Sequence, residues 1–532
     1  MKDNQTTATN RLSGNYYFGR SAVTIGVMLA VTLLVLLAPE MAKWAGNSIF
    51  SLATHTLGGP VMLVVLIYFL IMLWLSFSKY GNIRLGEGKP EYSTWAWFAM
   101  LFCASSATAC AYWAFNEWPA LYTYMQGEFA TGGGANALGG MLTEEAKVEL
   151  ARAYNFADWG PISYCAQSFA AIPMAYYFYN KRKNSWAFDV SCQRVIKKKW
   201  FGSFISTMGL LATFTALAYT TSLGVDLISE PLCYVLGIEP TFAFKIGMMI
   251  FVSVLFTLTS YVGVGKGMKR ISNMGAYVAI GVCIYVLLFS GYGVNIINST
   301  ISSLGLAANN YVRIATWLEP YHSSGMAQNW PIFYAFSFTM YAPFVGAFIG
   351  KISKGRSIRQ VALVSVMGAF AGFLLIHGVI GGYVAELMFA GKVDVLGLAT
   401  AGAGPEMVIQ TLMHLPLGKV AVIAFVIMAI LFLATTMDAG AHTLASGMKK
   451  TFKDGEETSP MVRFLWCIAV SVYPLGLVFI NADIQTIKSL TMIVAFPVFF
   501  MIMIQIISFI KEIRADYGRK SAQTIIDEFS LE

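Results

Sequence analysis

The chain has 532 residues, of which 57% are hydrophobic and 12% are charged, with a mean hydropathy of +0.62. Soluble domains carry about 25% charged residues, so this chain has too few charges to cover a surface that faces water. The net charge of +8 raises nucleic acid as a partner, but the positions of the basic residues decide that question. Composition therefore excludes an ordinary soluble protein and predicts an all-α integral membrane protein.

Apolar runs long enough to cross a bilayer recur along the chain, since a spanning helix needs about 20 apolar residues. The first run is followed by Pro39 and Glu40 rather than by a small-residue cleavage site, so we interpret it as a retained span and not as a signal peptide. The polar half of the stretch 271–312 is typical of an amphipathic segment at the interface. We predict twelve spans, at about 21–38, 56–78, 94–116, 159–180, 201–225, 246–265, 274–293, 330–350, 361–385, 418–437, 464–482 and 489–510.

The basic residues predict the orientation of these spans. Twelve spans place both termini on one side, and the loops and tails of that side hold 28 of the 36 Lys and Arg residues. Acidic residues show no such bias, as the positive-inside rule expects. We predict a multi-pass protein of the inner (plasma) membrane, in contact with lipid, with both termini cytoplasmic. Because the positive charge follows the topology loop by loop, no nucleic-acid partner is expected.

Two long connections, 117–158 and 386–417, fall on the outer side. The first contains the glycine run 132–134 and an acidic stretch in which Thr143 can cap a helix. A solvated connection is the simplest interpretation of this segment, and a gate or lid is the alternative.

Groups that catalyse reactions are scarce. The five histidines lie in five separate places, and the seven cysteines form no CxxC pair. Phosphate loops, dinucleotide fingerprints and GxSxG motifs are absent from the sequence, so we predict neither an enzyme nor a cofactor, apart from sodium as a coupling ion. Ionisable residues near the spans are candidates for ion or substrate coordination, although for His377 a hydrogen-bonded interior position is favoured. These residues are Glu117, Asp158, His377 and Asp438.

Spans three and eight are suited to close contacts. Span three carries the small residues Ala104 through Ala109, which let another backbone approach. Span eight places Tyr334, Phe338 and Tyr341 on one helical face, and Pro343 can break that helix. Broken helices near the midplane bind substrate in secondary transporters, and aromatic faces attract organic cations.

An ordered set of short motifs resembles the betaine/carnitine/choline transporter family over about residues 20–510. No single motif is decisive, and the order of the set carries the resemblance. The motifs are Arg84 through Ser93, Trp113 through Glu117, Asp158 through Pro161, Thr221 through Gly224, Lys266-Gly267, Ala342 through Gly346, Lys351 through Arg359 and Thr435 through Asp438.

The resemblance implies a LeuT-like fold of two inverted five-helix repeats, preceded by two helices, and a homotrimer. The implied organisation is a cytoplasmic N-terminus (1–20), two leading helices with their loop (21–93), a first repeat (94–293), an amphipathic linker (294–329), a second repeat (330–510) and a cytoplasmic tail (511–532).

The resemblance also implies an aromatic box for a quaternary ammonium group. The tryptophans of the family signature in span eight correspond here to Ala335, Ser337, Phe338 and Tyr341, so the box has lost tryptophan. Phe and Tyr bind cations more weakly than Trp, and polar side chains suit a substrate with an N–H, hydroxyl or carboxylate group. The implied substrate-binding residues are Trp159, Tyr164, Gln167, Ser337, Phe338 and Tyr341.

Two features of the sequence bear on the ion that is coupled to uptake, and they point in different directions. Ser105 through Ala109 replace the Gly-rich run of sodium-driven members, as in the family's sodium-independent exchangers. Those exchangers carry a fixed Arg in span seven, where this chain has Gly275. Phe432, Thr435 and Thr436 nevertheless match one sodium site of the symporters, which favours cation-coupled uptake. The implied cation-binding residues are Cys103, Ser106, Phe344, Phe432, Thr435 and Thr436.

We therefore predict a secondary transporter that imports a betaine-like osmolyte or nutrient. The alternatives are a sodium-independent exchanger and the same scaffold with a sulfonium, methylamine or amino-acid substrate. A non-transporting osmosensor is less favoured, because segment 511–532 is short and of mixed charge, whereas lipid sensing uses about four to eight clustered basic residues.

Overall fold

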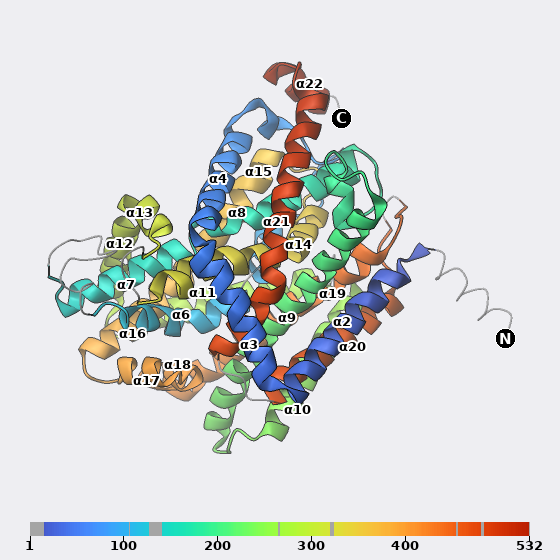
Figure 1. Cartoon of the computed structure of the whole chain (residues 1–532). Helices are drawn as coiled ribbons and strands as arrows, with labels where there is room; N and C mark the ends of the chain where they lie inside the picture. The colour runs from blue at the N-terminus through green and yellow to red at the C-terminus, as the bar shows by residue number, and fades with distance from the viewer. Residues whose placement is uncertain are drawn as a thin grey trace.

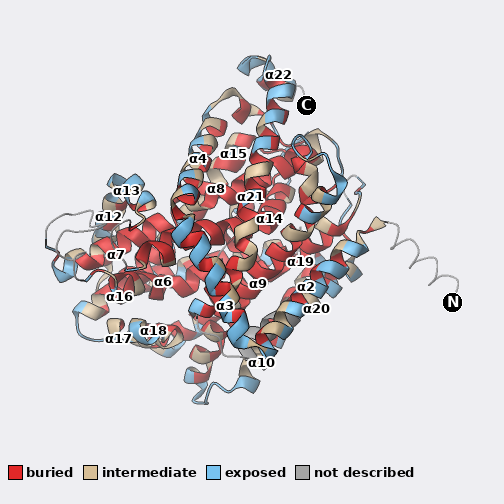
Figure 2. Ribbon diagram, in the orientation of Figure 1, coloured by how far each residue is buried: buried red, intermediate tan, exposed pale blue. Residues whose placement is uncertain are grey.

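The computed structural model describes residues 15–105, 107–126, 141–263, 267–319, 324–453, 456–479 and 484–530. Among these residues the regular structure is helical, apart from two isolated β-bridges that join Tyr16 to Lys449 and Arg84 to Ser357. The helices gather around a common buried centre (Figures 1 and 2). Ser106 and the glycine run 132–134 lie outside the described residues.

The N-terminal half begins with helices that pack along the outside of the core. In chain order its elements are α2 (Phe18–Leu37), α3 (Pro39–Ser51), η1 (Leu52–Thr56), α4 (Gly58–Phe77), η2 (Lys79–Asn82), α5 (Thr94–Ser105), α6 (Ala107–Tyr122), α7 (Glu144–Asp158), α8 (Pro161–Ala175), η3 (Tyr176–Asn180), η4 (Phe188–Cys192), α9 (Lys199–Leu236), α10 (Phe242–Val262) and α11 (Lys269–Phe289).

The C-terminal half begins with two helices of the predicted linker, α12 and α13. Its elements are α12 (Gly293–Asn309), α13 (Tyr311–Thr316), η6 (Gln328–Ile332), α14 (Phe333–Ile352), α15 (Ile358–Leu363), η7 (Val364–Gly368), α16 (Ala369–Phe389), α17 (Val395–Ala401), α18 (Gly404–Met413), α19 (Gly418–Met448), α20 (Pro460–Phe479), α21 (Ile484–Tyr517) and α22 (Ala522–Ser530).

Each of the twelve predicted span ranges contains a helix. Within the described residues, nine helices are long and apolar enough to cross a membrane, and the bent pair α5 and α6 makes a tenth span. Two of the predicted ranges fall short. In 159–180, α8 has 15 residues and passes into the π-helical turn η3, and in 464–482 the described apolar stretch of α20 is Pro460–Ser471. Since α8 is enclosed by protein, polar residues such as Gln167 and Ser168 need not face lipid. The number twelve stays a prediction.

The helix of span eight is not broken at Pro343, and the bend lies in span three instead. Helix α14 runs through Pro343 without interruption, whereas the axes of α5 and α6 differ by 63° in span three. Close packing stabilises the uninterrupted helix, since Gly346 of α14 lies directly on Ala170 of α8, where an added Cβ would not fit. This burial offsets the backbone hydrogen bond that proline cannot make.

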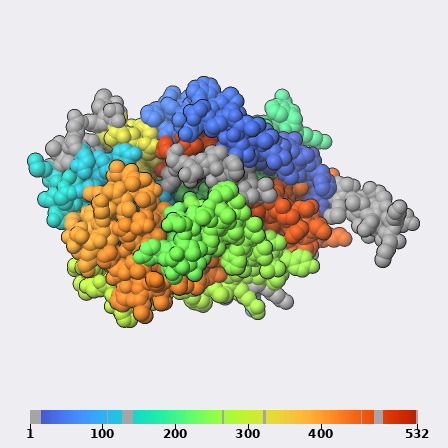
Figure 3. All heavy atoms as spheres, turned by 90° about the horizontal axis from the view of Figure 1, so that it is seen from below, coloured from blue at the N-terminus to red at the C-terminus, as the bar shows by residue number. Residues whose placement is uncertain are grey.

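The outer surface of the helix bundle is apolar. On α10, large side chains that protein does not cover include Ile250, Phe251, Val254 and Leu258, each exposed by more than half. Surface helices of this kind are typical of a protein whose exterior is covered by lipid. Seen from below, the N-terminal helices in blue run along one edge, and the orange segment near residue 400 lies on the other side (Figure 3).

The basic connections, which are the Lys- and Arg-rich segments 79–89, 181–199, 351–359 and 449–453, gather on one face of the molecule with α22. Helices α17 and α18 lie on the opposite side (Figure 1). The Lys and Arg counts predicted that these connections share one side, and the assignment of that side to the cytoplasm stays a prediction. Hydrogen bonds join the connections pair by pair: Leu85 with Arg356, Gly86 with Asn180, Lys79 with Gly518, Asn184 with Phe452, and Asn15 with Lys450.

The segment after Thr143 is not a solvated connection. Thr143 caps α7 as predicted, accepting a hydrogen bond from the Ala146 amide, but most of α7 is buried. Arg152, 1% exposed, donates to Ser299 and Thr300 of α12 and to the Gly378 carbonyl of α16. These bonds fasten α7 to two other helices, so α7 belongs to the core that positions the candidate site.

Candidate substrate and cation sites

A small cavity with aromatic walls lies where α6, α8, α9 and α14 meet. Five of the six predicted substrate-binding residues line it, and the sixth, Tyr164, lies behind Phe338 with its ring centroid 5.0 Å away. The wall also includes an alanine and three aromatic residues that the prediction did not contain. The lining residues are Ala109, Trp113, Trp159, Gln167, Tyr219, Tyr334, Ser337, Phe338 and Tyr341.

Trp159 is placed by a tight turn between α7 and α8. Gly160 is required there because a Cβ would meet Tyr311, and Pro161 begins α8. The indole stacks on Phe373 with an interplanar angle of 6°, and its edge-to-face neighbour Phe338 lies 5.5 Å away. These ring contacts fix the orientation of the indole, which lines the cavity.

Hydrogen bonds hold the polar groups at the rim of the cavity. The Ser105 hydroxyl, at the end of α5, donates to Gln167 Oε1 over 2.5 Å. The hydroxyls of Tyr341 and Thr220 are 2.6 Å apart. The amide nitrogen of Gln167 is buried and has no hydrogen-bond partner among the described residues. An unpaired donor beside an aromatic surface suits a ligand that carries an acceptor.

The cavity is too small for a methylated ammonium compound in this conformation. Its volume is about 20 Å³, which is room for about one water molecule. The rings therefore have to separate before a substrate of that class can enter.

Buried charged groups border the aromatic walls. Glu117 Oε2 accepts hydrogen bonds from Trp159 Nε1 and from the Tyr334 hydroxyl, both over 2.6 Å. The Lys488 ammonium lies 4.0 Å from the centre of the Trp330 ring and interacts electrostatically with Glu117 and Asp158. The sequence singled out Glu117 and Asp158, whereas Lys488, just before the predicted last span, carried no recognisable motif.

His377 has the interior position that the sequence favoured. Its ring is buried against Phe373, and its nitrogens lie 3.0 Å from Asn155 Oδ1 and 3.0 Å from the Cys110 carbonyl oxygen. Both ring nitrogens are thus occupied by protein partners, and His377 fixes α16 against α6 and α7.

Four of the predicted cation-binding residues, Cys103, Phe432, Thr435 and Thr436, lie where α5 meets α19, whereas Phe344 is on α14 and Ser106 is outside the described residues. The Thr436 hydroxyl is 3.1 Å from the Cys103 carbonyl oxygen and 3.0 Å from that of Phe432, while the Thr435 hydroxyl donates to Leu431. The Phe344 carbonyl instead accepts from Thr443, further along α19. Carbonyl and hydroxyl oxygens are the donors that hard cations prefer, so the Thr435–Thr436 group fits sodium.

Gly275 lies against the same group. A Cβ at Gly275 in α11 would come within 3.2 Å of the Phe432 ring. Gly275 is the position at which the sodium-independent exchangers carry a fixed Arg. It therefore lies next to the candidate cation site, and here the Phe432 ring fills the space.

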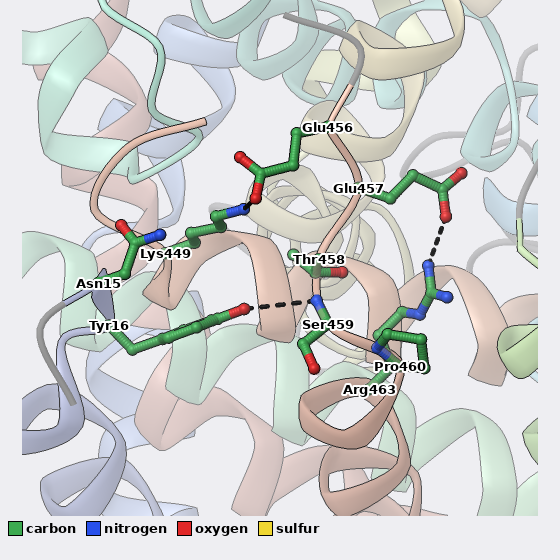
Figure 4. Close-up of a pocket in the computed structure, with 9 residues that line it drawn as sticks. All are labelled: Asn15, Tyr16, Lys449, Glu456, Glu457, Thr458, Ser459, Pro460 and Arg463. Atoms are coloured by element: carbon green, nitrogen blue, oxygen red, sulfur yellow. Dashed lines mark hydrogen bonds and ion pairs between the residues drawn. The ribbon is translucent and has the colours of Figure 1, made fainter. Parts of the chain in front are cut away.

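A larger hollow, of about 400 Å³, opens among the basic connections (Figure 4). Its charges are already paired, because Lys449 lies 2.5 Å from Glu456 and Arg463 lies 2.6 Å from Glu457. Asp438 is buried deeper on α19, 4.0 Å from His442 Nε2. Since the paired groups offer no spare charge to a ligand, the aromatic cavity is the better candidate for the substrate site.

Comparison with known proteins identifies the family. The profile of the betaine/carnitine/choline family of transporters matches residues 21–518. The chain belongs to this family. The carnitine transporter of Acinetobacter baumannii is 31% identical to this chain over 506 residues, which cover 94% of this chain and 89% of that protein.

Two further proteins are similar to this chain. The uncharacterised transporter YeaV of Escherichia coli K12 is 28% identical over 458 residues, covering 86% of this chain and 93% of the relative. A solved sodium-coupled sialic acid symporter, in a substrate-bound outward-open state, matches with 14% identity and a TM-score of 0.43, over 88% of this chain and 97% of that one. That structural likeness is too distant to carry an argument.

The family assignment confirms the resemblance found in the sequence and makes this multi-pass protein a transporter. Of the wall residues that the prediction lacked, Trp113 and Tyr334 stood in segments that the sequence had singled out. Tyr219 had no local signal, because it lies inside the long apolar helix α9 and reaches the cavity only through helix packing.

Proposed function

We propose that this chain is a secondary active transporter that imports a small betaine-like zwitterion or a quaternary or methylated ammonium compound by alternating access. Glycine betaine, carnitine and choline represent the substrate class. The observation that carries the proposal is the cavity between α6, α8, α9 and α14, where six aromatic side chains surround a few polar groups. Aromatic rings attract organic cations by about 0.5–2 kcal/mol for each well-placed ring.

The polar groups of the wall favour a substrate with a second functional group. Gln167 and Ser337 can hydrogen-bond a carboxylate or a hydroxyl, which carnitine and betaine carry beside their ammonium group. The name of the Acinetobacter relative makes carnitine the first ligand to test.

We further propose that uptake is coupled to sodium bound at Thr435 and Thr436, and that the face with the basic connections is cytoplasmic. This face would hold both termini at the inner membrane. The inverted repeats of 94–293 and 330–510 and the homotrimer are part of the same proposal, and they rest on membership of the family.

The test is binding of a ligand panel to the purified protein, followed by tryptophan fluorescence with and without sodium. Trp113 and Trp159 line the cavity and report directly on an occupied site. The panel contains carnitine, glycine betaine, choline, sulfonium analogues and methylamines. We expect sodium-dependent binding of one quaternary compound. If none of the ligands in the panel binds, the proposed substrate class is refuted.

The sodium-independent exchanger is the second candidate, because Ser105 through Ala109 replace the Gly-rich run of sodium-driven members. Binding of a quaternary compound that is indifferent to sodium would favour exchange. A counterflow assay in liposomes then separates exchange from uniport, since only exchange requires substrate on both sides.

A further inference from the structure

The Glu117 carboxylate lies directly behind the aromatic cavity. Glu117 is fully buried on α6, and its Oε2 atom accepts from Trp159 Nε1 and from the Tyr334 hydroxyl. Both partners line the cavity. One carboxylate oxygen therefore joins α6 to the α7–α8 turn and to α14 at the candidate substrate site.

Both of these bonds are ones that an ionised carboxylate accepts. An indole N–H can only donate, and two donors at 2.6 Å from one oxygen have the short lengths typical of charge-assisted hydrogen bonds. The other oxygen of Glu117 is buried and has no hydrogen-bond partner among the described residues, although the Asn155 side chain also interacts with the carboxylate. Negative charge at this position is thus only partly satisfied by the protein.

The charge of the Glu117 carboxylate is not neutralised by a single basic partner. Lys488 of α21 and Asp158 of α7 both interact electrostatically with Glu117. One ammonium group faces two carboxyl groups, so the cluster has an excess of acid. Of the remaining neighbours, Asn155 interacts with Glu117 through its side chain, and its Oδ1 atom lies 3.0 Å from His377 Nδ1.

We propose that Glu117 is the counter-charge for the cargo's cationic group and makes the cavity select a cation over a neutral molecule of the same shape. This inference rests on the proposed function and names the residue that determines its charge specificity. A buried carboxylate attracts a cation strongly because little water screens it. Its two hydrogen bonds also draw negative charge toward the rings of Trp159 and Tyr334. Both effects compensate for tryptophans that the box lacks.

The competing interpretation is that Glu117 only holds the two rings in place. Charge and position can be separated, because glutamine has nearly the shape of glutamate and still offers an acceptor oxygen. A ligand pair separates them further: choline, and its neutral isostere in which a tert-butyl group replaces trimethylammonium. The two ligands make the same shape-dependent contacts and differ in charge.

The experiment measures the binding of both ligands to the purified wild-type protein and to Glu117→Gln. We expect Glu117→Gln to weaken choline binding by about tenfold or more and to change binding of the neutral isostere by less than about twofold. The matched control is Glu406→Gln, since Glu406 bonds only Gln410 on α18 among the described contacts, and it should leave both affinities unchanged.

Equal losses for both ligands, or no loss for choline, would overturn the proposal. If Glu117→Gln does not fold, Tyr334→Phe provides the decision, because it removes one hydrogen bond and keeps the charge. Retained preference for choline in Tyr334→Phe supports a charge effect, and loss of that preference assigns Glu117 a positioning role. Absence of any quaternary ligand binding to the wild type would refute the proposed function instead.

Discussion

The two candidate sites of this transporter are built from different parts of the polypeptide. The aromatic cavity is made of side chains from four helices, and its chemistry is that of Trp159, Tyr334 and their neighbours. The candidate cation site uses the backbone carbonyls of Cys103 and Phe432 together with the hydroxyl of Thr436. Side-chain identity governs the first site, whereas the relative placement of α5 and α19 governs the second.

This difference determines how each site can be changed. A substitution in the cavity alters the ligand's contacts directly, so its effect falls on substrate affinity. Carbonyl oxygens cannot be removed by substitution, and only the threonine hydroxyls of the cation site are open to mutation. If the two sites are distinct, a substitution in the cavity should leave nearly unchanged the sodium affinity measured without substrate. A substitution in the cation site should likewise leave nearly unchanged the substrate affinity measured without sodium.

The largest effect is expected for Trp159→Ala. It removes an aromatic wall and leaves Glu117 without one of its donors, so substrate affinity should fall by at least about tenfold. Binding and uptake are measured together, and the folding of the purified variant is checked by size-exclusion chromatography. Trp159→Phe keeps a ring and should have an intermediate effect. Unchanged affinity in Trp159→Ala would remove Trp159 from the site.

A smaller effect is expected for Thr436→Ala. The change removes the only side-chain oxygen that contacts both the Cys103 and the Phe432 carbonyls among the described bonds. The sodium concentration for half-maximal uptake should rise about fivefold, as loss of one hydrogen-bonding group suggests. Thr436→Ser retains the hydroxyl and should behave like the wild type. Uptake that is indifferent to sodium in all three proteins would eliminate the sodium site.

The sequence predicted most helices because hydropathy reports which segments face lipid. It underestimated helices that continue inside protein. The span predicted at 418–437 is part of α19, which runs to Met448, and the additional turns carry His442 and Ser446 buried among other helices. Hydropathy falls at such residues although the backbone remains helical, so the end of the apolar run was not the end of the helix.

The position of the helix break could not be read from proline alone. Pro343 suggested a break in span eight, but packing of α14 on α8 keeps that helix continuous. The bend lies between α5 and α6, where the small residues give no comparable signal. In the same way, family motifs located Trp159, Gln167 and Phe338, while Tyr219 and Lys488 needed the packed structure to bring them to the site.

The smallest and most informative effect concerns the link between the sites. Ser105 lies two residues after Cys103 on α5 and donates to Gln167, which lines the cavity. Ser105→Ala should therefore change each affinity little on its own, but reduce the factor by which sodium strengthens substrate binding by about threefold. The factor is measured from both directions, because thermodynamic linkage requires substrate to strengthen sodium binding equally. Ser168→Ala is the control, since that buried serine instead bonds Ser365, on η7. An unchanged factor in Ser105→Ala would show that the two sites communicate through another contact, and the direct pairing of Thr436 with α5 would be the next to test.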